Sequence, residues 1–301
     1  MIDCTVHLLS LDSSLSSKDA ATLLSKALST PTTTNPLLVT GIPHGWIHKP
    51  HVQDAALLLA HDWHLFALTS PPPNTPLNLT ATNNSILAHA TIAISIPETQ
   101  YTALLTTRNS PPTPLPTTPP LPAAWHNPQT NTLSIPPSAI APKTTTNPTS
   151  TTRPAPGTLN LDSEMASFLS SLLPSPASQT PISLFNLFQY ARADSTTHDA
   201  YMSQFKSTFG DSAGASVKFM GPVKSPLALS VSPPSSSEGE GQNQAARGQG
   251  WQDANLVQYD SVWHYAWMLS TGEYAELNRG KVEGLADTGI LGVGEWEVWG
   301  L

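Results

Sequence analysis

The sequence contains little cysteine and little charge, and each shortage excludes a class of protein. Cys4 is the only cysteine among 301 residues, so an internal disulfide is impossible and a reducing compartment fits best. Only 11% of the residues are charged, and the net charge is −8. The 13 basic residues are scattered without a run, whereas binding to phosphate backbones needs clustered Lys and Arg. We therefore expect no nucleic-acid partner.

Long apolar segments are also missing. No window approaches the ~20 apolar residues that a membrane-spanning helix needs. The first residues, MIDCTVHLLSLD, have neither the basic flank nor the long apolar stretch of a signal peptide. We expect no membrane partner, and by default a cytoplasmic protein.

The short motifs that mark common cofactor and metal sites do not occur. There is no HExxH and no cysteine pair. The run Gly292–Gly294 lacks the third glycine and the strand-turn-helix context of a dinucleotide site. The sequence thus predicts no cofactor and no bound metal.

Proline, in contrast, is abundant and unevenly distributed. Of 30 prolines, 14 fall in residues 110–157, where they are mixed with Thr, Ser and Asn. Such a composition buries too little apolar area to offset its ordering entropy, so it is typical of a linker. Within it, Leu121–Ile135 carries Trp125 and is a candidate for docking. We predict a first lobe at 1–109, a linker at 110–157 and a second lobe at 158–301, with a disordered insertion at 225–250.

The second half alternates strands and helices in a recognisable order. Its strongest strand, Ile182–Tyr190, is apolar on both faces, which is typical of a strand covered on both sides. The helix that follows Asp260 and Ser261 is interrupted around Gly272. The whole reads β-α-β-(loop)-β-α-β, the ferredoxin-like order, and the first half reads less cleanly as β-α-β-(short α)-β-β-α. The predicted fold class is α+β with two ferredoxin-like lobes.

Three stretches of this half resemble a known superfamily. They are ISLFNLFQY, YMSQFKSTFGDSAGASVKFMG and YDSVWHYAWMLSTGEYAELNRGKVEGLADTGIL, within residues 181–298. Together they resemble the dimeric α/β-barrel superfamily, in particular small DUF1330-like proteins. The insertion at 225–250 and the weaker first half depart from that pattern.

This resemblance implies an architecture but no single activity. Members pair two ferredoxin-like antiparallel sheets into a barrel, usually by dimerising, so here the first lobe would take the second subunit's place in a pseudo-dimeric α/β barrel. The chain would then be a monomer or a weak homodimer. The superfamily includes cofactor-free monooxygenases, dehydratase-like and decarboxylase-like enzymes, haem enzymes and many proteins of unknown activity, and a fold does not choose among them.

The candidate pocket residues are polar or aromatic groups on predicted strands and helices. In GIPHGWIHKPH an extended backbone places His44, Trp46 and His48 on one face, and histidine is the natural proton carrier near neutral pH. Asn186 shares a strand face with Leu184 and Phe188, so it is either a structural hydrogen-bonding group or a polar anchor in a barrel-interior pocket. His264 is either a half-exposed helix residue or a further pocket group.

Two functional hypotheses remain open at this point. In the first, an uncharacterised barrel-type protein binds or transforms a small organic molecule by metal-independent acid-base chemistry. In the second, a non-catalytic barrel protein serves assembly or partner binding. The first requires a cavity with converging buried polar groups, and the second predicts a filled interior and an exposed apolar patch.

Overall fold

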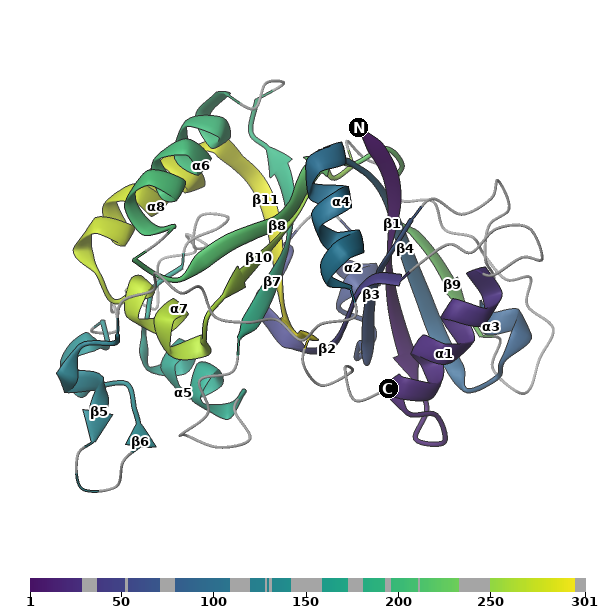
Figure 1. Cartoon of the computed structure of the whole chain (residues 1–301), viewed down its shortest axis with the longest axis horizontal. Coiled ribbons are helices and arrows are strands. Elements are labelled where there is room, and N and C mark those ends of the chain that lie inside the picture. Colours follow the sequence, from purple (N-terminus) through teal and green to yellow (C-terminus); the bar gives the residue numbers. More distant parts are fainter. Residues whose placement is uncertain are drawn as a thin grey trace, which may run out of the picture.

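The computed structural model has an α+β fold in which helices cover a large antiparallel sheet (Figure 1). It describes residues 1–28, 37–51, 54–70, 79–108, 120–127, 129, 132–141, 159–172, 181–192, 196–210, 212–232 and 250–295. In these residues, no helix is both long and apolar enough to cross a membrane.

The first lobe, residues 1–108, contains four strands and four helices. They are β1 (Ile2–Leu11), α1 (Ser17–Leu28), β2 (Leu37–His48), α2 (Ala55–Leu58), β3 (Leu65–Thr69), α3 (Leu79–Thr82), β4 (Ile86–Ile96) and α4 (Glu98–Thr107). The α1 helix begins after Ser16, whose hydroxyl accepts from the Asp19 amide at 3.1 Å, the standard way to satisfy a free first-turn donor.

The second lobe, in its described residues between 159 and 295, carries the rest of the sheet and the four remaining α-helices, which pack on one apolar cluster. Its elements are α5 (Ser163–Ser171), β7 (Ile182–Tyr190), α6 (Thr196–Phe209), β8 (Ala215–Pro222), β9 (Ala228–Val231), β10 (Asp253–Tyr259), α7 (Val262–Leu269), α8 (Gly272–Gly284) and β11 (Leu285–Gly294). Ser261 and Thr271 cap α7 and α8, because each side chain accepts a first-turn amide. The helix pair is therefore broken where Ser270 to Gly272 intervene.

Nine strands form one sheet in the order β8-β10-β7-β11-β2-β3-β1-β4-β9, and every pairing in it is antiparallel. Strand β9 pairs with β4 at the outer edge, and each lobe contributes four of the other eight strands in the same arrangement. In chain order, the first and third of these (β1 and β3, β7 and β10) lie in the centre, and the second and fourth (β2 and β4, β8 and β11) lie at the edges. This arrangement is consistent with a ferredoxin-like fold in both lobes. The lobes join where β11 pairs with β2.

Strands β4 and β8 lie at the two ends of this arrangement of eight strands. They approach each other but do not pair along their length. Near β4 and β8, Ile94 and Val223 form an isolated bridge, and the Lys224 amide donates to the Ala93 carbonyl at 2.8 Å. The sheet is not closed, so the barrel that the resemblance implies is not established by the strand pairing.

Apolar side chains from both lobes nevertheless meet on the concave side of this sheet. We call this region the inter-sheet core; among its members are Val6, Leu8, Phe66, Leu68, Ile92, Phe185, Leu187, Phe219, Leu256, Leu291 and Val293. Phe66 of the first lobe and Phe185 of the second have ring centroids 5.1 Å apart. Leu104 of α4 joins the same cluster, and α4 lies between the lobes in Figure 1. The inter-sheet core is therefore built from buried apolar side chains of both lobes.

Parts of the proline-rich stretch and of the expected insertion are ordered elements of the structure. Residues 120–141 include two short 3-10 turns and the hairpin β5 (His126–Asn127) with β6 (Thr132–Leu133), and Trp125 and Leu133 are buried against the second lobe. Strand β9, which falls inside 225–250, pairs with β4. Residues 109–119, 142–158 and 233–249 lie outside the described residues.

Candidate functional site

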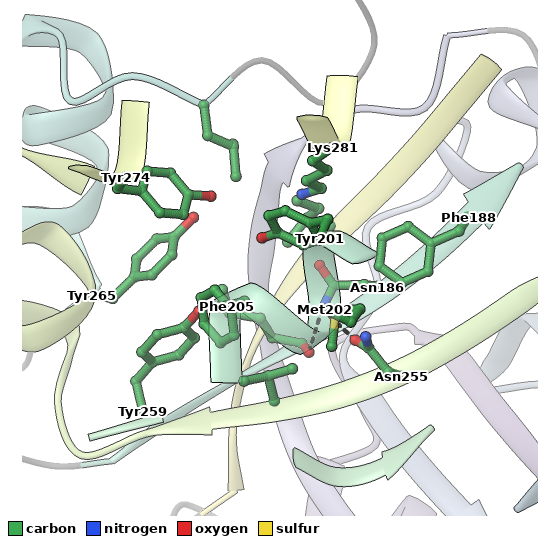
Figure 2. Close-up of a pocket in the computed structure, with 14 residues that line it drawn as sticks. Asn186, Phe188, Tyr201, Met202, Phe205, Asn255, Tyr259, Tyr265, Tyr274 and Lys281 are labelled. Atoms are coloured by element: carbon green, nitrogen blue, oxygen red, sulfur yellow. Dashed lines mark hydrogen bonds between the residues drawn. The ribbon is translucent and has the colours of Figure 1, made fainter. Parts of the chain in front are cut away.

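A cavity lies in the second lobe between the sheet and the helices α6, α7 and α8 (Figure 2). It offers about 30 Å³ to the centres of water molecules, enough for roughly two of them at ~10–15 Å³ each. The face of β7 that lines it is that of Leu184, Asn186 and Phe188, opposite to the face of Phe185 and Leu187 in the inter-sheet core. The cavity is therefore on the helix-covered side of the sheet.

Two asparagines form the polar part of its floor. Asn186 on β7 and Asn255 on β10 are direct register partners, so their side chains emerge side by side on one face. The Asn186 side-chain amide donates to Asn255 Oδ1 at 2.8 Å and to the Leu184 carbonyl at 3.0 Å. Both donor hydrogens of Asn186 are thus engaged, which fixes its carbonyl oxygen in place.

Four tyrosines surround the opposite part of the cavity: Tyr201 of α6, Tyr259 of β10, Tyr265 of α7 and Tyr274 of α8. The hydroxyls of Tyr201 and Tyr274 are hydrogen-bonded to each other, and Tyr274 also donates toward Asn278 Oδ1 at 3.4 Å. The hydroxyl of Tyr265 is buried and has no hydrogen-bond partner among the residues that the structure describes. Burial raises the pKa of all four phenols, so they stay protonated as hydrogen-bond donors.

Lys281 of α8 is the one cationic side chain in the lining. It is only 3% exposed, and its ammonium lies 5.9 Å from the centre of the Phe188 ring. Burial lowers the pKa of Lys281 from 10.5 to about 8. Figure 2 shows its nitrogen directed toward the tyrosine side of the cavity. A lysine with such a pKa exchanges protons near neutral pH.

A second polar cluster lies beside Lys281. The Tyr190 hydroxyl donates to the Asp253 carboxylate and lies 3.4 Å from His198 Nδ1. His198 is fully buried, and its Nε2 has no partner among the described residues. Burial, with a smaller contribution from the positive charge of Lys281, lowers the pKa of His198 to about 4. The imidazole is therefore neutral at physiological pH.

Of the five pocket residues expected from the sequence, Asn186 lines this cavity and the other four do not. Trp46 packs at the edge of the inter-sheet core, and a Cβ on Gly294 would meet the His44 ring, so both lie near the β2–β11 junction. The His48 ring contacts His51, with centroids 5.2 Å apart. His264 is buried rather than half-exposed, and its Nδ1 lies 2.8 Å from the Ser261 hydroxyl at the start of α7.

The sequence interpretation did not select Lys281, Tyr201, Tyr259 or Asn255. A lone lysine on a helix normally projects into solvent, and this preference argued against Lys281 in a buried site. A signal was nevertheless present, because Tyr274, Leu277 and Lys281 recur at i, i+3 and i+7 on one helix face.

No group of three or more His, Cys, Asp or Glu side chains suited to hold a metal ion occurs within the described ranges. No protein-family model matches the chain, and no curated protein matches it. One solved structure that it resembles is a protein of unknown function from Rhodopseudomonas palustris, a structural genomics target, with 15% identity and a TM-score of 0.32. The match covers 46% of this chain and 96% of that one.

Proposed function

We propose that this protein binds a small organic molecule in the cavity under α6, α7 and α8 and acts on it by metal-independent acid-base chemistry. The observation that carries the proposal is Lys281, a buried ammonium facing a cavity whose other polar groups are phenols and amides. Buried cations without a structural partner are costly for a fold, so they are more readily explained by function than by stability.

The acid-base part of the proposal rests on a lysine whose pKa is lowered and on four tyrosines whose pKa values are raised. Lys281, with a pKa of about 8, takes up or releases a proton near neutral pH. The four phenols have raised pKa values and act as hydrogen-bond donors to a developing negative charge. The neighbouring His198 is neutral and adds no charge to the site.

The finer architecture belongs to the same proposal: a pseudo-dimeric α/β barrel of the DUF1330-like type, monomeric or weakly homodimeric and cytoplasmic. The equal strand order in the two lobes and the approach of β4 to β8 support it. Light scattering of the purified chain tests the oligomeric state, since a tight dimer would contradict internal pairing of the lobes.

The binding proposal is tested by fragment screening with ligand-observed NMR. Met202 lines the cavity, and Met165 of α5 packs against the same core cluster without lining it; both are partly buried. Met202→Trp should narrow the cavity and abolish the binding of wild-type hits, whereas Met165→Trp should preserve it. A folded wild-type protein without hits, or hits that tolerate Met202→Trp, would overturn the proposal.

A non-catalytic role in assembly or partner binding is the second candidate, and one observation favours it. Buried apolar side chains of both lobes make up the inter-sheet core, which supports that hypothesis. Its other expectation, an exposed apolar patch, finds weaker support, since the exposed large apolar residues in the described ranges are Met1, Leu59, Leu87, Val217 and Val231. Concentration-independent light scattering together with fragment binding in the cavity would decide against it.

A further inference from the structure

The charge balance around Lys281 points to the chemical class of the ligand. The ion pairs of Lys218 with Glu295 and of Arg279 with Glu276 do not involve Lys281. The nearby Asp253 is held by the Tyr190 hydroxyl, and burial alone accounts for the lowered pKa of Lys281. Within the described part of the chain, no carboxylate therefore offsets the positive charge of this ammonium.

The remaining lining contributes donors rather than acids. Besides Lys281, the polar side chains of the lining are those of Asn186, Asn255 and the four tyrosines, and the lining contains no Asp, Glu or His. The hydroxyl of Tyr265, which is 1% exposed, is a second buried polar group without a partner in the described structure. Two unpartnered donors, one cationic and one neutral, thus face the same small space.

The side chains around Lys281 on β7, α6 and α7 do not neutralise the positive charge of its ammonium. Strand β7 presents Phe188 and Asn186, α6 presents Tyr201 and His198, and α7 presents Tyr265. Each of these is neutral at pH 7, because burial raises the phenol pKa values and lowers that of His198. An anion entering the cavity would meet one unit charge and several neutral donors, and no negative charge in the lining.

The size of the space favours a compact, singly charged group. About 30 Å³ admits on the order of two waters, which matches a carboxylate group and its first carbon rather than a phosphate with its larger shell. One ammonium also balances one negative charge, whereas phosphate recognition normally recruits several cations or an Arg fork.

We infer that the cavity is a carboxylate site: Lys281 pairs with the ligand's carboxylate, and Tyr265 donates a hydrogen bond to it. This inference rests on the binding function proposed above and adds the substrate class, a small carboxylic acid whose remaining atoms extend toward the cavity opening. Figure 2 shows the convergence of the lysine nitrogen and the tyrosine hydroxyls on which the assignment depends.

The test compares acetate with acetamide, which have nearly the same shape and differ in charge, by ligand-observed NMR on the full chain. A charge-assisted bond in a desolvated site should make acetate bind at least about tenfold more tightly at pH 7. Lys281→Met should erase that preference and leave acetamide binding. Lys206→Met, which removes one exposed lysine charge from the neighbouring helix α6, should keep it.

The pH profile supplies a second readout. Acetate is ionised above about pH 6, so its affinity should be flat from there to the pKa of Lys281, near 8, and should then fall by about tenfold per pH unit. If acetate and acetamide bound with equal affinity, and Met202→Trp abolished the binding of both, the carboxylate assignment would be refuted but the binding site would still be supported. Failure of both probes to bind the folded protein would overturn the assignment together with the proposed site, and preferential binding of inorganic phosphate would replace carboxylate by phosphate as the anion.

Discussion

The helix-covered faces of the two lobes handle buried polar groups in opposite ways. In the first lobe, His7 Nδ1 lies 2.9 Å from His89 Nε2, and His7 Nε2 lies 3.1 Å from the Thr69 hydroxyl, so both nitrogens of His7 are partnered within the lobe. In the second lobe, Lys281 and the Tyr265 hydroxyl face a cavity without such partners among the described residues. The two lobes thus share a strand order, but the buried polar groups of the first lobe bond to one another, whereas those of the second lobe face a cavity.

The difference arises in the connection between β3 and β4 in the first lobe and between β10 and β11 in the second. The described part of the first connection contains α3, which has 4 residues; the second contains α7 with 8 and α8 with 13. The longer pair delivers Tyr265, Tyr274 and Lys281 above the sheet, and the short turn has no counterpart to them. A shared scaffold acquires a site through what is added between its strands, which is why fold alone does not name a function.

The largest effect should come from the region where the two lobes are alike, the inter-sheet core. Phe66→Ala and Phe185→Ala should each destabilise the protein by about 3–5 kcal/mol, because both rings are fully buried. In a double-mutant cycle from urea unfolding, the pair should show a coupling of about 1 kcal/mol.

The control for that cycle pairs Phe185 with Phe205, which lies on the helix side of the same sheet. These two changes should add within about 0.5 kcal/mol. If Phe66 and Phe185 proved equally additive, the lobes would not pack face to face in solution. Leucine replaces alanine at these positions if a double variant fails to fold.

The next largest effect concerns Lys281, which is present in the second lobe alone of the two regions compared. Lys281→Met should stabilise the protein at pH 7 by about 3 kcal/mol, the value of lowering a lysine pKa from 10.5 to about 8 at 1.36 kcal/mol per unit. The unfolded chain binds more protons than the folded chain between these two pH values, so wild-type stability rises as pH increases through them. The advantage of the variant should therefore shrink above pH 8, which urea titrations at a series of pH values can follow.

The contrast also shows how far the sequence could lead. The apolar pattern of Ile182–Tyr190 and the capped, broken helix after Ser261 predicted the α+β class and the order of strands and helices along the second lobe, because local periodicity carries that information. Asn186 was selected as a pocket residue inside the barrel, but the cavity that it lines is on the helix-covered side of the sheet. Its partner Asn255 and the lysine above it could not be paired from the sequence, because they meet only after β10 and α8 pack onto β7.

A smaller effect concerns acid stability. His198 keeps a folded pKa of about 4, against 6.5 for the unfolded chain, so the unfolded state takes up a proton first as pH falls. Its contribution is intact above pH 6.5 and is lost between 6.5 and 4. Replacing it by His198→Phe should reduce the acid destabilisation between pH 7 and 5 by about 2 kcal/mol.

His89, with the same lowered pKa of about 4, provides the comparison in the first lobe. Its neighbour His7 also has a pKa well below 6.5, through burial and the proximity of His89. Hydrogen exchange at pH 5 should therefore show the first lobe opening at least as readily as the second. Protection of the first lobe that does not change with pH would contradict neutral, buried histidines there.

The smallest effect tests whether the stability of α8 contributes to ligand binding, since this helix carries Tyr274 and Lys281. Thr271 caps this helix by accepting the Tyr274 amide at 3.2 Å, and Ser16 caps α1 of the first lobe in the same way. Thr271→Ala and Ser16→Ala should each cost about 1 kcal/mol. Because α8 carries Tyr274 and Lys281, the first change should also weaken acetate binding, by no more than about fivefold, whereas the second should leave it untouched. If the two variants lost stability equally and neither changed the affinity, α8 would hold its side chains without help from its cap, and the site would depend on packing against α6 instead.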